Sequence, residues 1–189
     1  MKIQANTVRV GNVLERDGKL WVVSGTQIVQ PGKGGAFIQI EMKDIKVGTK
    51  TSDRYRTSET VDRAILEELD FQYLYPEGDD FTFMNQETFD QITVPGTVMG
   101  DVKTKFLQDG MVVQIALHEG SPLSVTLPKQ VTLEITEADP VVKGQTASSS
   151  YKPAVLANGV KTLVPPFIAA GERVVVNTED GSYVERAKD

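Results

Sequence analysis

Residues 70–85 read DFQYLYPEGDDFTFMN, two short alternating segments on either side of Pro76-Glu77-Gly78. Polar and apolar side chains that alternate with period two are typical of half-buried β-strands. Proline and glycine between two such segments favour a tight turn. The stretch therefore predicts a β-hairpin, with strands over 70–75 and 80–85.

The same pattern recurs on both sides of this hairpin. Residues 12–16 and 19–24 flank Asp17-Gly18, a pair that supplies the positive φ angles of a two-residue hairpin turn. Further strands are predicted over residues 36–42, 49–57, 111–118, 131–136 and 173–177. Helical patterns are confined to residues 86–92 and 102–108, whereas a parallel sheet usually needs a helix at each crossover. We predict an all-β protein of several small antiparallel barrels.

Charge divides the chain into three parts. Its 189 residues carry 20 Lys and Arg against 26 Asp and Glu, a net charge of −6. The net charge is +4 over residues 1–63, −9 over 64–128 and −1 over 129–189. This asymmetry predicts three domains with those bounds and different partners at the two ends. Drift of surface charge without a function is the alternative.

The residue inventory excludes several kinds of chemistry. With no cysteine, the chain has no disulfide, thiolate zinc site or cysteine nucleophile, and a single histidine, His118, excludes a two-histidine metal site. No G-x-S-x-G motif surrounds the serines at 148–150. The longest charge-free run, 20–32, is shorter than the roughly 20 residues of a membrane span. We expect a cytoplasmic protein that is not an enzyme and has no metal, cofactor or membrane partner.

Residues 30–36, QPGKGGA, lie between two predicted strands and form the tip of a hairpin. Pro31 restricts φ, and Gly32, Gly34 and Gly35 let the backbone approach a partner closely. Lys33 is then one long cationic side chain on a slender loop. A P-loop is excluded because Gly34 stands where its Ser or Thr belongs and because a strand, not a helix, follows. An ordinary glycine-rich hairpin is the alternative.

Two further segments suit nucleic-acid binding. A row of basic residues shares one strand parity and could follow a phosphate backbone, namely Lys46, Lys50, Arg54 and Arg56. A solvated strand face is the alternative. Residues 144–153, GQTASSSYKP, form a polar loop whose hydroxyl groups could donate to RNA, or else a flexible linker.

Several segments together resemble bacterial elongation factor P over essentially the whole chain. They are PGKGGAF at 31–37, YLYPEGDDFTFMNQETFDQI at 73–92, EITEADPVVKGQTASSSYKPA at 134–154, VPPFIAAGE at 164–172 and DGSYVER at 180–186. The resemblance implies an SH3-like (KOW-like) N-terminal domain over 1–63, an acidic central OB domain over 64–128 and a C-terminal OB domain over 129–189. It also implies an outline like that of a transfer RNA.

The resemblance further implies a monomeric factor that binds the 70S ribosome between the peptidyl and exit sites. Members relieve stalling at consecutive prolines, while the ribosome itself catalyses peptidyl transfer. Lys33 matches the position that a dedicated enzyme lengthens, often with a β-lysyl group, and that reaches the CCA end of the P-site peptidyl-tRNA. The tip glycines and Pro31 would lie beside that CCA end, and the basic row would lie along the acceptor arm.

In the C-terminal third, the resemblance implies two more contacts. A loop approaches messenger RNA in the exit site and comprises Gly144, Gln145, Thr146, Ala147 and Ser148. Tyr183 and Arg186 match positions near the anticodon stem of the P-site tRNA. The rival hypothesis is a generic OB-fold binder of single-stranded RNA, which should expose aromatic stacking platforms, although only 7% of the residues are aromatic.

Overall fold

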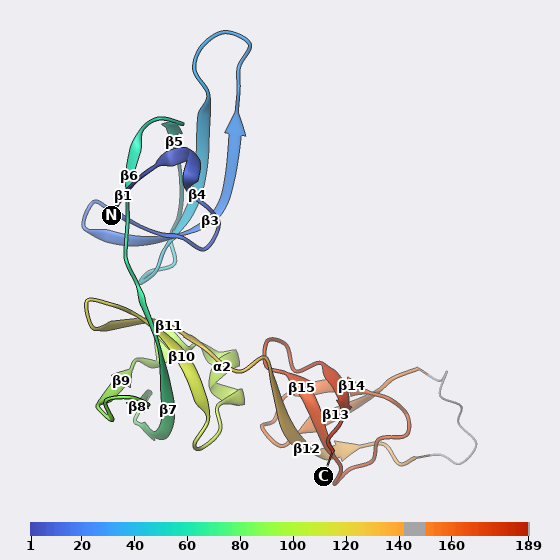
Figure 1. Ribbon diagram of the computed structural model, residues 1–189. Coiled ribbons are helices and arrows are strands. Elements are labelled where there is room, and N and C mark those ends of the chain that lie inside the picture. Colours follow the sequence, from blue (N-terminus) through green and yellow to red (C-terminus); the bar gives the residue numbers. More distant parts are fainter. Residues whose placement is uncertain (142–149, 189) are drawn as a thin grey trace. The chain divides into compact units, whose positions relative to one another are not determined.

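The computed structural model describes residues 1–141 and 150–188, and it contains three antiparallel sheets (Figure 1). The predicted all-β class is confirmed. By contacts the chain divides into two compact units, one made of Met1–Glu67 with Leu117–Leu123 and the other of the rest of the described chain. The domain bounds at 63/64 and 128/129, and the tRNA-like outline, stay predictions.

The first sheet is built from the N-terminal strands. Its order is β1-β6-β2-β3-β4-β5, with β1 Lys2–Gln4, β2 Val13–Arg16, β3 Lys19–Val29, β4 Phe37–Asp44, β5 Lys50–Arg56 and β6 Thr60–Arg63. A 3-10 turn, Ala5–Thr7, follows β1. Asp17 and Gly18 join β2 to β3 with φ angles of 53° and 72°, as a two-residue hairpin requires. Alternate apolar residues of β3 and β4, including Val23, Ile38 and Ile40, form the core.

The second sheet contains the hairpin at residues 70–85. Its order is β11-β10-β7-β8-β9, with β7 Glu67–Glu77, β8 Asp80–Asn85, β9 Gln91–Val94, β10 Val112–His118 and β11 Ser121–Thr126. Two short helices, α1 Gly96–Met99 and α2 Asp101–Phe106, lie between β9 and β10. Phe83 is fully buried, with its ring centroid 5.4 Å from that of Tyr73. These aromatic rings build the core and are not stacking platforms for RNA.

Two details of this sheet correct the sequence-based prediction. Strand β7 continues through Pro76 and Glu77, two residues beyond the predicted end, so the turn is confined to Gly78 and Asp79, with Gly78 at φ 63°. A register shift between Tyr73 and Tyr75 moves the pairing along β7, which the local sequence does not reveal. Residues 86–92 hold no helix, because Phe89 has φ 63° and β9 begins at Gln91. The helix predicted at 102–108 is confirmed as α2.

The third sheet comprises the C-terminal strands. Its order is β14-β13-β12-β15-β16, with β12 Gln130–Ala138, β13 Lys152–Leu156, β14 Lys161–Val164, β15 Arg173–Asn177 and β16 Tyr183–Arg186. Ile135, Leu156, Val174 and Val176 are almost fully buried within it. Because β12 pairs with both β13 and β15, it is the central strand of this sheet.

Candidate nucleic-acid interface

The β3–β4 hairpin carries the glycine-rich tip away from its sheet (Figure 1). The two strands pair from Trp21 with Asp44 to Val29 with Phe37, and a bulge lies between Val23 and Gly25. All residues from 26 to 35 are exposed. The predicted hairpin tip is therefore confirmed as a protruding loop that begins after Val29 and ends before Phe37.

The tip itself makes no packing contact through its glycines. A Cβ atom added at Gly32, Gly34 or Gly35 would meet no other atom within 4 Å. Only Gly34 needs glycine for its backbone, because its φ is 112°. The fold therefore gives no reason for glycine at positions 32 and 35, and Lys33 is exposed between them. A partner that approaches the backbone closely would explain glycine at these two positions.

The basic row is only partly as predicted. Strand β5 alternates exposed and half-buried residues from Lys50 to Arg56, so Lys50, Arg54 and Arg56 share its exposed face. Lys46 does not belong to that row, which corrects the prediction. It lies in a turn before the strand, where its backbone amide donates to Asp44 Oδ1 at 2.8 Å, and Gly48 at φ 83° interrupts the extended chain.

Arg54 is held on the sheet by an aromatic ring. Its guanidinium carbon lies 5.8 Å from the ring centroid of Phe37. Strand β4 pairs Phe37 with Arg56 and Gln39 with Arg54, so the contact runs diagonally across the two strands. Phe37 was not predicted as a site residue, because the register that places it beside Arg54 is not visible in the local sequence.

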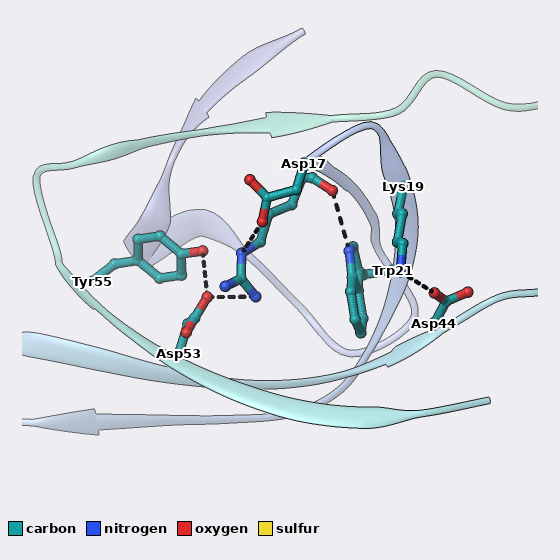
Figure 2. A network of polar contacts seen from close by, with 7 residues as sticks. Asp17, Lys19, Trp21, Asp44, Asp53 and Tyr55 are labelled. Carbon is teal, nitrogen blue, oxygen red and sulfur yellow. Dashed lines mark hydrogen bonds and ion pairs between the residues drawn. The ribbon is translucent and has the colours of Figure 1, made fainter. Parts of the chain in front are cut away.

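The inward face of β5 explains why the basic residues point outward. Asp53 Oδ2 lies 2.6 Å from Arg16 Nη1 and accepts a hydrogen bond from the Tyr55 hydroxyl at 3.3 Å. Figure 2 shows Asp53 and Tyr55 directed into this network, which also contains Trp21, whose indole N–H donates to the Arg16 carbonyl oxygen at 3.3 Å. Burial, and then the charge of Asp53, raise the pKa of Tyr55. These contacts fix the parity of β5.

The same end of the first sheet contains a second acidic anchor. Asp44 is 4% exposed, and its Oδ1 accepts hydrogen bonds from the amides of Lys46 and Val47 at 2.8 and 3.2 Å. These two amides hold the pKa of Asp44 below its ordinary value. Lys19 Nζ lies 3.8 Å from the other carboxylate oxygen (Figure 2). Asp44 thereby closes the turn that leads into β5.

In the C-terminal sheet, Tyr183 and Arg186 lie on one face of β16. Residues three apart point to opposite faces of a regular strand. Here β15 pairs Val176 with Tyr183 and Val174 with Arg186, and the register shift between Val175 and Val176 places an extra residue in β16. The bulge therefore brings together the two residues that the sequence singled out.

Arg186 is also fixed by neighbours that were not predicted. Its Nη2 lies 3.0 Å from Glu172 Oε1 and donates to the Phe167 carbonyl oxygen at 3.1 Å, while its guanidinium lies 4.9 Å from the Phe167 ring centroid. Tyr183 packs edge-on against Tyr151 at 6.4 Å, and burial raises the pKa of its phenol. Phe167 and Glu172 fall within the quoted stretch VPPFIAAGE, but only the fold places them under Arg186. The predicted loop at 144–148 lies outside the described residues.

Among residues 1–141 and 150–188, no group of three or more His, Asp or Glu side chains could hold a metal ion. In the same part of the chain, no helix is long and apolar enough to cross a membrane.

Comparison with known families covers nearly the whole chain. A model described as the elongation factor P KOW-like domain matches residues 4–61, one of the elongation factor P OB domain matches 66–125, and one of the elongation factor P C-terminal region matches 131–186. The KOW-like and OB descriptions agree with the predicted SH3-like and OB-type barrels.

Individual relatives give the same result. The elongation factor P of Rhodospirillum centenum is 65% identical over 189 residues, and that of Gluconacetobacter diazotrophicus is 62% identical over 188, each comparison covering 100% of both chains. Among solved structures, eukaryotic translation initiation factor 5A from Methanococcus jannaschii matches with a TM-score of 0.58 at 22% identity, over 67% of this chain and 92% of that one. At that identity the likeness concerns the fold alone.

Proposed function

The chain belongs to the elongation factor P family and is a translation elongation factor, and from this premise we propose that it relieves ribosomes stalled at consecutive prolines. In this proposal it binds the 70S ribosome in the cytoplasm, between the peptidyl and exit sites. The observation that carries the proposal is the β3–β4 hairpin, which presents Lys33 on a loop whose glycines contact nothing in the fold. Such a loop can enter a narrow site without disturbing the sheet that supports it.

The proposed mechanism is positioning rather than bond making. Proline is a constrained reactant, so part of its barrier lies in the alignment of the reacting groups. Correct alignment can contribute about 7–11 kcal/mol in favourable reactions, and about 1.4 kcal/mol already gives a tenfold rate. The Lys33 ammonium, with three donors, would hold sugar and phosphate oxygens at the CCA end of the peptidyl-tRNA. The ribosome remains the catalyst of peptidyl transfer.

We also propose that a dedicated enzyme modifies Lys33. The side chain is exposed and its neighbours Gly32 and Gly34 leave free space around it. An added group would lengthen the cationic arm and bring more donors to the tRNA end. An unmodified intact mass of the protein from its native host would contradict this part of the proposal.

Charge supports the proposed orientation on RNA. Lys50, Arg54 and Arg56 on the exposed face of β5 would lie along the acceptor arm, where phosphates attract cations. Residues 64–102, in contrast, contain nine acidic residues and no Lys, Arg or His. This segment would be repelled by phosphates, so we expect it to face away from the RNA backbone.

The C-terminal region would contact other parts of the same complex. Tyr183 and Arg186 would reach the anticodon stem of the P-site tRNA, and their shared face on β16 supports a common partner. Residues 144–148 would approach messenger RNA in the exit site. The factor would act as a monomer, because these contacts require one copy of each region.

The test is synthesis of a tri-proline peptide on purified ribosomes with no factor, with protein from the native host, and with Lys33→Ala and Lys33→Arg. We expect rescue by the native protein only, since Lys33→Arg keeps a charge but cannot carry the same modification. Lys161→Ala, at an exposed lysine of another sheet, is the control and should rescue fully. Failure of the native-host protein to rescue would contradict the proposed function.

A further inference from the structure

The C-terminal end of β3 has a neighbouring strand on one side only. Strand β2 pairs with β3 from Lys19 to Val22, whereas β4 continues to pair with it as far as Val29. In the described part of the chain, the segment Thr26–Val29 thus has β4 beside one edge and no strand beside the other. Figure 1 shows β3 running beside β4 up to the tip of the hairpin.

The direction of the backbone groups follows from the pairing of β4 with β5. The Thr57 amide donates to the Ala36 carbonyl at 3.2 Å, so Ala36 directs its backbone groups toward β5. Hydrogen-bonded and non-bonded pairs alternate along an antiparallel ladder. Ile38 and Ile40 therefore also bond toward β5, and Phe37 and Gln39 bond toward β3.

On β3, the partners of Phe37 and Gln39 are Val29 and Gln27, which complete those bonds. Thr26 and Ile28 alternate with them and direct their N–H and C=O groups away from the sheet. No hydrogen bond to either residue occurs outside the strand ladders in the described chain. The segment presents the backbone pattern that an added antiparallel or parallel strand would satisfy.

This edge lacks the usual protection against added strands. Native edges are often blocked by charged side chains, yet residues 20–32 carry no charge. Ile28 is 58% exposed and Val29 is 41% exposed. A bulge at Val23–Gly25 and Pro31 limit the free edge to about four residues, a length suited to a short extended peptide.

The tip poses a recognition problem that this edge would solve. The chain has 13 lysines, and an enzyme that modifies Lys33 alone must read something beside the lysine itself. Gly32, Gly34 and Gly35 offer no side chains, so the information must come from the stem of the hairpin. Ile28 is five residues from Lys33, at most about 18 Å along an extended chain.

We propose that the enzyme that modifies Lys33 docks on this protein by adding one of its own strands to the free edge of β3 at Thr26–Val29, with an apolar pocket for Ile28. This inference rests on the proposed modification of Lys33. An extended peptide fits the edge better than RNA does. The edge presents alternating backbone N–H and C=O groups that another strand could bond, and it presents no cation that would attract phosphates.

The experiment uses the full chain, expressed with a tag in the native host, and follows the mass of Lys33 peptides with time after induction. Ile28→Pro and Thr26→Pro each remove an outward N–H that makes no bond within the sheet. Ile28→Ala keeps the amide and removes the side chain. Gln27→Ala is the matched control, because it removes an exposed side chain from the same segment at a residue whose backbone bonds to β4 and not to the free edge. Thermal unfolding of each purified variant checks that the barrel remains folded.

We expect the initial rate of modification to fall at least about tenfold in both proline variants, to fall less in Ile28→Ala, and to be unchanged in Gln27→Ala. Wild-type rates in folded proline variants would overturn the docking proposal and leave the proposed function intact. Unmodified wild-type protein would overturn the modification itself, and the docking proposal with it. Normal modification with lost ribosome binding, or loss of a wild-type dimer in sedimentation, would assign the edge to the ribosome or to a second copy and would also overturn the proposal.

Discussion

The two hairpin ends of the first sheet differ in how they are held. The Asp17-Gly18 turn sits beside a network in which Arg16 bonds Asp53 and Trp21 bonds the Arg16 carbonyl (Figure 2). At the tip, no backbone hydrogen bond outside the strand ladders involves residues 30–35 in the described chain. Both ends contain glycine and reverse the chain, yet only the first is held by side-chain contacts. The difference indicates that the turn serves stability and that the tip serves a partner.

The largest effect is expected from bulk at the tip. Gly35→Leu should lower the rate of tri-proline synthesis about 100-fold, since a displacement of about 1 Å can cost that much in a positioned reaction. Its free energy of unfolding should stay within about 0.5 kcal/mol of wild type, as for surface changes generally. Gln27→Leu places the same leucine side chain at an exposed position on the stem and serves as the control. A large loss of stability in Gly35→Leu would contradict the contrast between the two ends.

The opposite result is expected at the network. Asp53→Ala leaves Arg16 and Tyr55 without their shared acceptor and should reduce the free energy of unfolding by about 1.5 kcal/mol. Tri-proline synthesis at a temperature where the variant is folded should remain at the wild-type rate. Urea unfolding followed by fluorescence of Trp21, the single tryptophan, reports on this region directly. Unchanged stability would show that the network does not hold the turn.

A smaller effect is expected on the exposed face of β5. The double variant Arg54→Ala with Arg56→Ala should weaken ribosome binding several-fold and reduce the slope of log affinity against log salt by roughly 2, about one per lost phosphate contact. Lys46→Ala should leave the slope unchanged, because Lys46 lies in the preceding turn. Binding measured over a range of salt concentrations checks both. An unchanged slope in the double variant would remove β5 from the proposed acceptor-arm contact.

The smallest effect concerns pH. The folded state lowers the pKa of Asp44, so its ionised carboxylate stabilises the fold above its ordinary value of 3.8. That contribution should be lost as the pH falls through the lower, folded-state pKa. Trp21 pairs with Asp44 across β3 and β4, so its fluorescence can follow acid unfolding nearby. Asp44→Asn should be less sensitive to acid than wild type in this range, and equal sensitivity would contradict the assignment.

The sequence predicted strands better than it predicted their registers. Alternation located β2 to β5 and the β7–β8 hairpin, because one face of each strand is buried and its side chains report that burial locally. The predictions of the turn at Pro76 and of a helix over 86–92 were wrong, since a register shift and the positive φ of Phe89 depend on neighbouring strands. These features arise from long-range pairing and leave no periodic signal.

Among the candidate site residues, too, local features were predicted and long-range contacts were not. Lys33 was located by a motif that is contiguous in sequence, and the structure places it on the protruding tip. Lys46 was misplaced because strand parity was extended across Gly48. Phe167 and Glu172, which hold Arg186, lie 19 and 14 positions before it in the chain. Their contact with Arg186 forms only in the folded third sheet, so the local sequence did not predict it.

The length of the paired stem between the bulge and the tip also sets how far Lys33 reaches from the sheet. Each residue pair of an antiparallel hairpin adds about 3.3 Å of length. One extra residue in each strand would therefore extend the reach of Lys33 by about 3.3 Å and turn the tip over, because strand faces alternate with period two. Two extra residues in each strand would keep the face and add about 6.6 Å. The number of pairs beyond the bulge thus sets, in whole steps, both how deep the lysine can reach and which way it faces.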